Sequence, residues 1–361
     1  MSDANELISF IASMSGEGNL RVEENLGEGY VRLRVSEAER RQAKQDIQHV
    51  EDIVIEMLRN ARDAGADKVY LATTKEDGVR TLVFLDNGSG VPQDMQERIF
   101  DARVTSKLES MKMDRWGVHG RGMALFSIKQ NTDEARVVTS GVDLGSVFKV
   151  SVATDRLGER ADQSSWPQAV KDEDGHYVCA RGPHNIIRAA CEFALEELRA
   201  CDVYLGSPSE IAATLHAQAS SRLDASRLLF IDDEAELPVV DRLGLASDAE
   251  DFIRICSGLG LEMSERTAHR ILAGQIKPVR GVTARLLRER DSSSHASAPV
   301  DLAKDRRGLR IAKDDMAQFS RAVERDFNDL ASRYYLNLCG DPKIRVSRDR
   351  ITVTFDLAKE E

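Results

Sequence analysis

The sequence has no apolar run near the roughly 18 residues that a membrane-spanning helix needs. Its first residues, Met-Ser-Asp-Ala-Asn-Glu, also lack the basic segment and the apolar stretch of a signal peptide. These two absences predict a cytoplasmic protein with no membrane partner.

Cysteine is scarce, with five residues in a chain of 361. The number is odd, the cysteines are scattered and no two form a CxxC pair, so neither a disulfide framework nor a zinc site is indicated. We expect reduced thiols, most of them in the core.

Basic residues are fewer than acidic ones, and the formal net charge is -11. This balance argues against a protein whose whole surface binds nucleic acid or an anionic membrane, although it is compatible with a local basic face. Hydrophobic residues make up 42% of the chain, which is enough for a sizeable core, and the length suits two or three domains.

The first half alternates helical and β-rich segments. Ser36 and Glu39 predict a capping box for a helix that runs to about Ala64 and is stopped by Gly65. The other expected elements are strands at 29–35, 68–73, 81–85, 136–139 and 146–152, short helices at 93–100 and 122–130, and a mobile lid at 101–121. This order predicts an α+β fold with a mixed, mostly antiparallel sheet and helices on one face.

The second half has weaker patterns. They predict helices at 186–201, 209–219 and 313–335, a helical region over roughly 248–290, and a hairpin of 343–346 with 350–355. We therefore expect a first domain over 1–155, extending at most to about 190, a linker and helical segment over 156–240, a helical segment over 241–295, and a C-terminal helix with a β-hairpin over 296–361. The sequence leaves open whether the hairpin pairs within the chain or with a second protomer.

Three polar side chains share one face at the end of the first long helix. Glu56, Asn60 and Asp63 are spaced i, i+4 and i+7, which places them on the same side of the helix. A carboxylate can take a proton from water, and a carboxamide oxygen can ligate Mg2+. The spacing therefore suits a site that holds a water molecule and a divalent ion.

A glycine-containing loop, DNGSGVP, follows an apolar strand. A buried aspartate at the strand end, Asp86, can accept a hydrogen bond from the exocyclic amine of adenine. Gly88 and Gly90 allow positive φ and let the backbone approach a ligand closely.

A second glycine-containing run, GVHGRGMALFSI over residues 117–128, leads into an apolar helix. The first N–H groups of such a helix suit phosphate oxygens, and a lysine just upstream, in Thr-Ser-Lys, can reach a terminal phosphate. Each run alone is common in unrelated proteins. Their order, with a strand before Asp86 and an apolar helix after the glycines, is specific.

Together these segments resemble the GHKL, or Bergerat-fold, ATPase superfamily. EMLRNARDAGADKVYL resembles its N box, DNGSGVP its first glycine box and GVHGRGMALFSI its second. The TSK of ARVTSKL is similar to a feature of the MutL and topoisomerase VI B types. The likeness covers residues 25–155, and it implies a Bergerat-type α/β sandwich that binds ATP and Mg2+.

The resemblance implies a role for each matching residue. Glu56 would be the general base for the attacking water, Asn60 would hold Mg2+, and Asp63 would lie beside the adenine pocket or brace it. Asp86 would bind the adenine. The other implied contacts are Gly88, Gly90 and Ser146 around the adenine, Gly117, Gly120, Arg121 and Gly122 in a phosphate lid, and Thr105, Ser106 and Lys107 near the γ-phosphate.

Two histidines and the N box indicate which type of GHKL protein the chain resembles. Histidine kinases need a phosphoacceptor histidine on a dimerisation helix, whereas His49 lies only seven residues before Glu56 and is expected to be a partly exposed helix residue. His119, in the lid, is expected to be solvated. Glu56, DAGA and TSK favour hydrolysis of the MutL, topoisomerase VI B or large heat-shock chaperone type, although the second glycine box is closer to the kinase or topoisomerase pattern.

A basic stretch in the second half resembles a helix-turn-helix unit. Basic residues are in excess from Arg266 to Arg290 although the chain is acidic. In such a unit the second helix enters the major groove of DNA, and the contacts to phosphates or bases would come from Arg266, Arg270, Lys277 and Arg280. An ordinary helical hairpin with a solvated charged face gives the same pattern, so both interpretations stay open.

The sequence therefore predicts an ATP-binding and ATP-hydrolysing molecular switch. ATP would close the lid, favour a homodimer and change the affinity for DNA or for an unknown protein client. Two alternatives stay open: a chaperone-like ATPase that acts on protein clients, and a histidine-kinase-like or anti-sigma-like regulator that phosphorylates a protein.

Overall fold

The computed structural model describes residues 22–106, 112–114, 116–119, 122–160, 162–223, 233–287, 313–331, 336–340, 342–346 and 351–359. The chain forms two compact units, Met1–Asp291 and Ser292–Glu361. The finer division predicted from the sequence stays a prediction. Among the described helices, none is long and apolar enough to cross a membrane.

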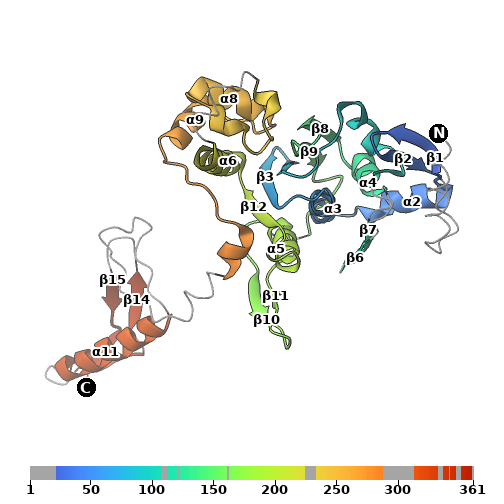
Figure 1. Ribbon diagram of the computed structural model, residues 1–361. Helices are drawn as coiled ribbons and strands as arrows, with labels where there is room; N and C mark the ends of the chain where they lie inside the picture. Colours follow the sequence, from blue (N-terminus) through green and yellow to red (C-terminus); the bar gives the residue numbers. More distant parts are fainter. Residues whose placement is uncertain are drawn as a thin grey trace. The chain divides into compact units, whose positions relative to one another are not determined.

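A five-stranded sheet with the order β12-β3-β4-β9-β8 forms the centre of the first unit (Figure 1). β12 runs parallel to β3, and the other neighbouring pairs are antiparallel. The predicted mixed, mostly antiparallel sheet is confirmed. Its strands are β3 (Lys68–Glu76), β4 (Val79–Asp86), β8 (Glu134–Ser140), β9 (Ser146–Ala153) and β12 (Asp202–Gly206).

Helices from the first 200 residues cover one face of this sheet. Because side chains alternate along a strand, Leu71 of β3 and Phe84 of β4 point to this side, where they join a core that includes Leu58 and Phe193. This layer carries the polar helix face that the sequence singled out. Its helices are α2 (Glu37–Asp46), α3 (Val50–Asp63), α4 (Ala124–Asn131) and α5 (Ile186–Glu196).

Helices from the following part of the chain cover the opposite face. The strand residues between those of the first face, such as Tyr70 and Val83, belong to a second core with Phe252 and Leu215. The sheet is thus the middle of three layers: the helices of the first domain lie on one face, as the sequence predicts, and helices from the later part of the chain cover the other. The helices of this layer are α6 (Pro208–Arg222), η4 (Arg242–Leu245), α8 (Ala249–Gly258) and α9 (Glu265–Leu272), with η3 (Glu234–Glu236) preceding η4.

The single long helix predicted from Ser36 to Ala64 is wrong, because the chain breaks it into α2 and α3. The predicted capping box of Ser36 and Glu39 does begin α2. At the break, Asp52 Oδ2 accepts hydrogen bonds from the backbone N–H groups of Gln48, at 3.0 Å, and His49, at 2.9 Å. These bonds start a new helix, and His49 is therefore the N-cap of α3 and not a mid-helix residue.

Small elements surround the central sheet. The predicted short helix at 93–100 is two 3-10 turns, η1 (Gln93–Met95) and η2 (Arg98–Phe100). A small sheet has the order β1-β2-β5, and two hairpins pair β6 with β7 and β10 with β11. Their bounds are β1 (Val22–Gly27), β2 (Tyr30–Leu33), β5 (Val104–Thr105), β6 (Lys112–Asp114), β7 (Gly117–His119), β10 (Gln168–Lys171) and β11 (Tyr177–Arg181).

The second unit contains the predicted helix and hairpin. The hairpin pairs β14 with β15 inside the chain, with Lys343 opposite Thr354. Phe327 of the helix stacks on Phe355 at 4.0 Å between ring centroids, which packs the two elements together. The bounds are α11 (Lys313–Ala331), β13 (Leu336–Leu338), β14 (Lys343–Val346), β15 (Ile351–Thr354) and β16 (Leu357–Lys359), which pairs with β13.

Candidate functional site

A cavity of about 620 Å³ lies on the side of the sheet that carries α3 and α4. Its size is in the range of small-molecule sites. Most of the residues that the sequence singled out line it, although they come from five separate segments of the chain. They are Glu56, Asn60, Asp63, Asp86, Gly90, Thr105, Ser106, Gly122 and Ser146.

The remaining predicted site residues are placed differently. Gly88 packs against the end of α3, where an added Cβ would come within 2.8 Å of the Ala64 carbonyl oxygen. Gly117 belongs to β7. Lys107, Gly120 and Arg121 lie outside the described residues, as does the side chain of His119.

Asp86 stands at the end of β4 with only 4% of its surface exposed. One carboxylate oxygen, Oδ1, accepts a hydrogen bond from Gly88 N at 2.8 Å. This bond fixes the carboxylate at the cavity wall, where Ser146 of β9 is the directly paired residue on the neighbouring strand. The pair forms a buried polar corner that can recognise a hydrogen-bonding group of a ligand.

Two glycines allow loops to meet directly behind this corner. Gly90 has φ +72°, and a Cβ there would lie 1.8 Å from the carbonyl oxygen of Gly141. Gly145 has φ +76°, and a Cβ there would lie 2.1 Å from the carbonyl oxygen of Asp86. Any other residue would clash with backbone at both positions, so the wall depends on glycine for its shape.

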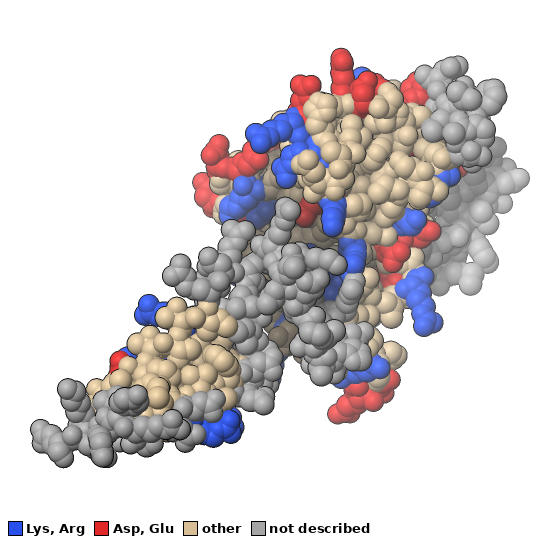
Figure 2. Space-filling model, turned by 90° about the vertical axis from the view of Figure 1, so that its left-hand side faces the viewer, with Lys and Arg blue, Asp and Glu red and all other residues tan. Residues whose placement is uncertain are grey.

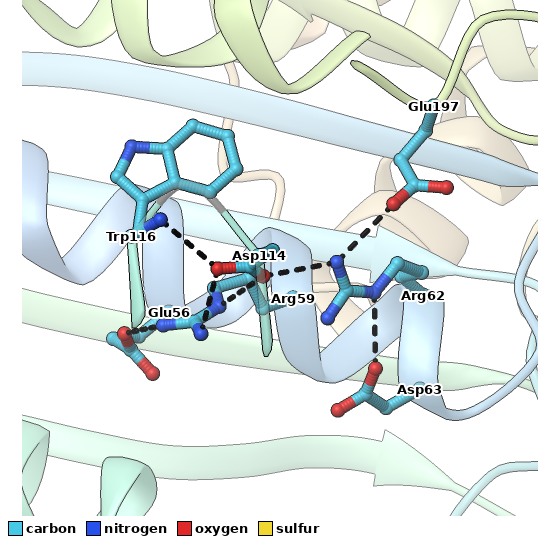
Figure 3. A network of polar contacts seen from close by, with 7 residues as sticks. All are labelled: Glu56, Arg59, Arg62, Asp63, Asp114, Trp116 and Glu197. Carbon is cyan, nitrogen blue, oxygen red and sulfur yellow. Dashed lines mark hydrogen bonds and ion pairs between the residues drawn. The ribbon is translucent and has the colours of Figure 1, made fainter. Parts of the chain in front are cut away.

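Two arginines of α3, which the sequence reasoning did not single out, hold the carboxylates of that helix. Arg59 Nη1 donates to Glu56 Oε1 at 2.6 Å, and Arg62 Nε donates to Asp63 Oδ1 at 3.0 Å (Figure 3). Arg62 Nη1 also donates to Glu197 Oε1 at 3.2 Å, next to the C-terminal end of α5. These hydrogen bonds fix the orientation of the Glu56 and Asp63 side chains.

Asp114 connects both arginines to the β6–β7 hairpin (Figure 3). Its two carboxylate oxygens accept from Arg59 Nε at 2.9 Å and Arg59 Nη2 at 3.0 Å, and Oδ2 also accepts from Arg62 Nη1 at 3.1 Å. Burial alone would raise the pKa of Asp114, but the two guanidinium groups and the backbone N–H of Trp116 outweigh it and lower that pKa. These contacts hold the β6–β7 hairpin against α3, and β7 contains the first residues of the second glycine box.

The middle of that glycine box lines the cavity. Gly122, Met123 and Ala124 line it, and α4 begins at Ala124 with no side-chain cap on its N-cap residue Met123. A helix start of this kind leaves backbone N–H groups that favour an anionic ligand.

Several lining residues were missed by the sequence reasoning. They include Tyr30 of β2, Glu39 of α2, Arg103 and Trp116. Burial raises the pKa of Tyr30, and a hydrogen bond with Ser106 acts in the opposite direction. Two of them could have been found from their places in the sequence, because they lie next to motif residues. Arg103 is two residues before the TSK run, and Trp116 directly precedes the second glycine box.

Comparison with known proteins agrees with this geometry. Residues 47–161 match the family described as histidine kinase-, DNA gyrase B- and HSP90-like ATPase. This part of the chain belongs to the GHKL superfamily. Within that superfamily, the GHKL domain is MutL-like.

Two relatives illustrate the likeness. A DNA mismatch repair protein MutL of Thermodesulfovibrio yellowstonii is 33% identical over 93 residues, which are 25% of this chain and 17% of the relative. A DNA mismatch repair protein MutL of Staphylococcus aureus is 28% identical over 136 residues, 35% of this chain and 20% of the relative. The chain thus spans no more than about a fifth of the length of these curated relatives.

The predicted basic unit lies outside the GHKL match. α9 begins at its N-cap Ser264 and buries Ala268 and Ile271 in the second core. The predicted contact residues are all exposed: Arg266, Arg270, Lys277 and Arg280.

Proposed function

We propose that the GHKL domain binds ATP in the cavity and hydrolyses it with the help of Mg2+. The observation that carries the proposal is the convergence of an acidic residue at a strand end, a carboxylate and a carboxamide on α3, and the uncapped start of α4 in one cavity. The acidic residue at the strand end suits the adenine of a nucleotide. The carboxylate and the carboxamide suit the attacking water and Mg2+, and the start of α4 suits the phosphates.

Adenine recognition is assigned to Asp86. Its Oδ1 is engaged by Gly88 N at 2.8 Å, and a carboxylate has further lone pairs that can accept the exocyclic amine of adenine. Ser146 beside it can contribute a hydroxyl. A purine with a carbonyl at the same position would place acceptor against acceptor, so this corner favours adenine over guanine.

Hydrolysis is assigned to Glu56. Its side chain is 22% exposed, so a water molecule can reach it, and Arg59 holds its orientation through the 2.6 Å hydrogen bond. The carboxylate would accept the proton of the water that attacks the γ-phosphorus. Positioning of water and base in this way is the main contribution of the protein, because phosphoryl transfer needs alignment and charge stabilisation.

The residues also fit a magnesium ion. Asn60 lines the cavity one helical turn from Glu56 and offers a carboxamide oxygen, and Mg2+ prefers oxygen ligands and keeps much of its coordination shell for water and phosphate. Asn60 would hold the ion, which supplies neutralisation of charge at the phosphate oxygens when bound.

The position of the second glycine box supports a nucleotide-dependent switch. Its start is tied to α3 through Asp114, and its middle lines the cavity at Gly122. Closure over ATP would change the surface around the box between nucleotide states, and a homodimer or a protein client that binds one state better would respond to it.

The test is release of inorganic phosphate from ATP by the full chain. We expect release in the presence of Mg2+, loss of release when EDTA removes the metal, and recovery when Mg2+ is added in excess. Release that is unaffected by EDTA would contradict the role of the metal. ATP that binds without any release would leave a nucleotide sensor and exclude an ATPase.

DNA binding near α9 is a second candidate function. The exposed side chains of Arg266, Arg270, Lys277 and Arg280 favour it, and the relatives are DNA mismatch repair proteins. On the face drawn in Figure 2, basic and acidic side chains lie beside one another. Attraction of DNA phosphates would therefore be limited to the basic residues near α9 and would not extend over the whole face.

Titration of a fluorescent DNA duplex with the full chain at several salt concentrations tests this candidate. We expect binding that weakens with salt, and a salt slope that falls by about 1 for each phosphate contact removed in a variant carrying Arg266→Ala and Arg270→Ala. A variant carrying Arg136→Ala and Arg156→Ala, two exposed arginines outside the basic unit, should keep the wild-type slope. Equal slopes in both variants would exclude the α9 surface.

A further inference from the structure

Arg103 is a buried cation on the cavity wall and lies outside the motif residues that the sequence singles out. It lines the cavity while its side chain is only 9% exposed. Nη2 donates to Glu39 Oε1, and Nε has no hydrogen-bond partner among the residues that the structure describes. A buried guanidinium N–H without an acceptor is unfavourable. A ligand oxygen that accepted a hydrogen bond from Nε would remove this cost.

The backbone of Arg103 is fastened to the second glycine box. Arg103 N donates to the carbonyl oxygen of Gly122 at 2.8 Å, and Leu33 N donates to the carbonyl oxygen of Arg103 at 2.9 Å. Arg103 has φ +61°, which is uncommon for a residue other than glycine and is held here by these contacts. Gly122 can lie so close only because it has no side chain, since a Cβ there would come within 2.7 Å of the Val104 carbonyl oxygen.

The present partner of Arg103 can release it without loss of structure. Glu39 uses its other oxygen, Oε2, to accept from Ser36 N at 2.8 Å and from Ser36 Oγ at 3.0 Å, which completes the capping box of α2. Of the two carboxylate oxygens of Glu39, Oε1 is the one that pairs with Arg103. Separation of the ion pair would leave the cap of α2 intact.

We propose that Arg103 is a ligand for the phosphates of the bound nucleotide, and that Glu39 competes with these phosphates for its guanidinium. A guanidinium presents several donors in one plane and matches phosphate oxygens. It stands beside Gly122, where the uncapped start of α4 faces the cavity. The proposal rests on the proposed function, because it assigns the phosphate end of the same cavity.

The alternative is a structural role, in which the ion pair only holds α2 against the cavity wall. The two roles predict opposite effects of removing the Glu39 charge on the affinity for ATP. If the pair is structural, removal of either partner weakens nucleotide binding. If Glu39 competes with phosphate for Arg103, removal of the Glu39 charge strengthens ATP binding while removal of Arg103 weakens it.

The experiment measures the affinities of the full chain for ATP and for adenosine in three proteins: wild type, Arg103→Met and Glu39→Gln. Glutamine can still form the capping box, so Glu39→Gln removes the charge and keeps the cap. We expect Arg103→Met to weaken ATP binding by about 10- to 100-fold and to leave adenosine binding unchanged. Glu39→Gln should bind ATP about two- to tenfold more tightly than wild type.

Wild-type ATP affinity in Arg103→Met would overturn the proposal, and so would an equal loss of adenosine and ATP binding. ATP binding that weakens in Glu39→Gln would overturn it independently, even if Arg103→Met does not fold. Wild type that binds neither ATP nor adenosine would instead refute the proposed function itself. The two failures are therefore distinguishable.

Discussion

A Glu56→Gln variant of the full chain is expected to bind ATP like the wild type and to release phosphate at least about 100-fold more slowly. Glutamine has nearly the same size, and its side-chain oxygen can still accept the hydrogen bond that Arg59 Nη1 makes with Glu56 at 2.6 Å. It cannot take a proton from water, so the loss should fall on the chemical step. ATP affinity and phosphate release, measured separately, check both halves of the expectation.

The matched control is Glu76→Gln, the same change at an exposed position at the end of β3. It should leave ATP binding and phosphate release at wild-type levels. Phosphate release at the wild-type rate by Glu56→Gln would remove Glu56 from the role of base. Loss of ATP binding in that variant would show that Glu56 acts in binding or in folding of the cavity.

An Asp86→Asn variant is expected to lose ATP affinity by about 100-fold or more, since a charge-assisted hydrogen bond is replaced by two facing donors. Asn can still accept from Gly88 N through its oxygen, which preserves the 2.8 Å bond that shapes the loop. Its NH2 group then points at the exocyclic amine of adenine. Equilibrium binding of ATP to folded protein measures the effect.

Asp77→Asn is the control for this prediction. Asp77 is exposed in the turn at the other end of β4 and has φ +48°, a conformation that asparagine also adopts. It should bind ATP like the wild type. If Asp86→Asn retained wild-type affinity, the acidic corner would not be the adenine site, and the cavity would have to bind its ligand in another orientation.

Local signals in the sequence predicted the parts of the fold that depend on local chemistry. The Ser36–Glu39 capping box begins α2, and Gly65 follows the end of α3 with φ +75°. The strand that ends in Asp86 pairs with β9 as far as Ser146, so two predicted residues meet across the sheet. The start of α2 and the end of α3 follow from short-range patterns in which each residue type has few alternatives.

The break between α2 and α3 was missed because the apolar spacing continues through it. Ile47 and Val50 keep the helical period, and the segment contains neither proline nor glycine. The break depends on Asp52, whose carboxylate caps the start of α3. An acidic residue three positions after an N-cap was a usable signal, but histidine is not a typical N-cap residue.

Coverage of the second face of the sheet was also missed, although the strands carried a sign of it. VYLA in β3 and LVFL in β4 are continuous apolar runs, and such runs indicate strands that are buried on both faces. The helices that cover this face lie more than 100 residues later, from Pro208 onward. The chain reaches this second face after β12, which pairs with β3. The sequence pattern alone does not predict that pairing.

The cavity was predicted from its motifs, but the contacts that orient it depend on the fold. Asp114 is 55 residues from Arg59 and has no motif of its own, and only the tertiary structure brings the two together. Arg103 and Glu39 are separated by 64 residues in the same way. The chemistry proposed for the motif residues restricts them to a few residue types, whereas many different side chains could hold them in place.

The assignment of the cavity as an ATP site is tested most directly by equilibrium binding of ATP to the wild-type full chain in the presence of Mg2+, with ADP and GTP as competitors. We expect saturable binding, displacement by ADP, and little displacement by GTP at the same concentration, because the proposed adenine site at Asp86 and Ser146 favours adenine over guanine. Absence of saturable ATP binding would contradict the assignment of the cavity as a nucleotide site. Displacement by GTP as effective as that by ADP would contradict the role of Asp86.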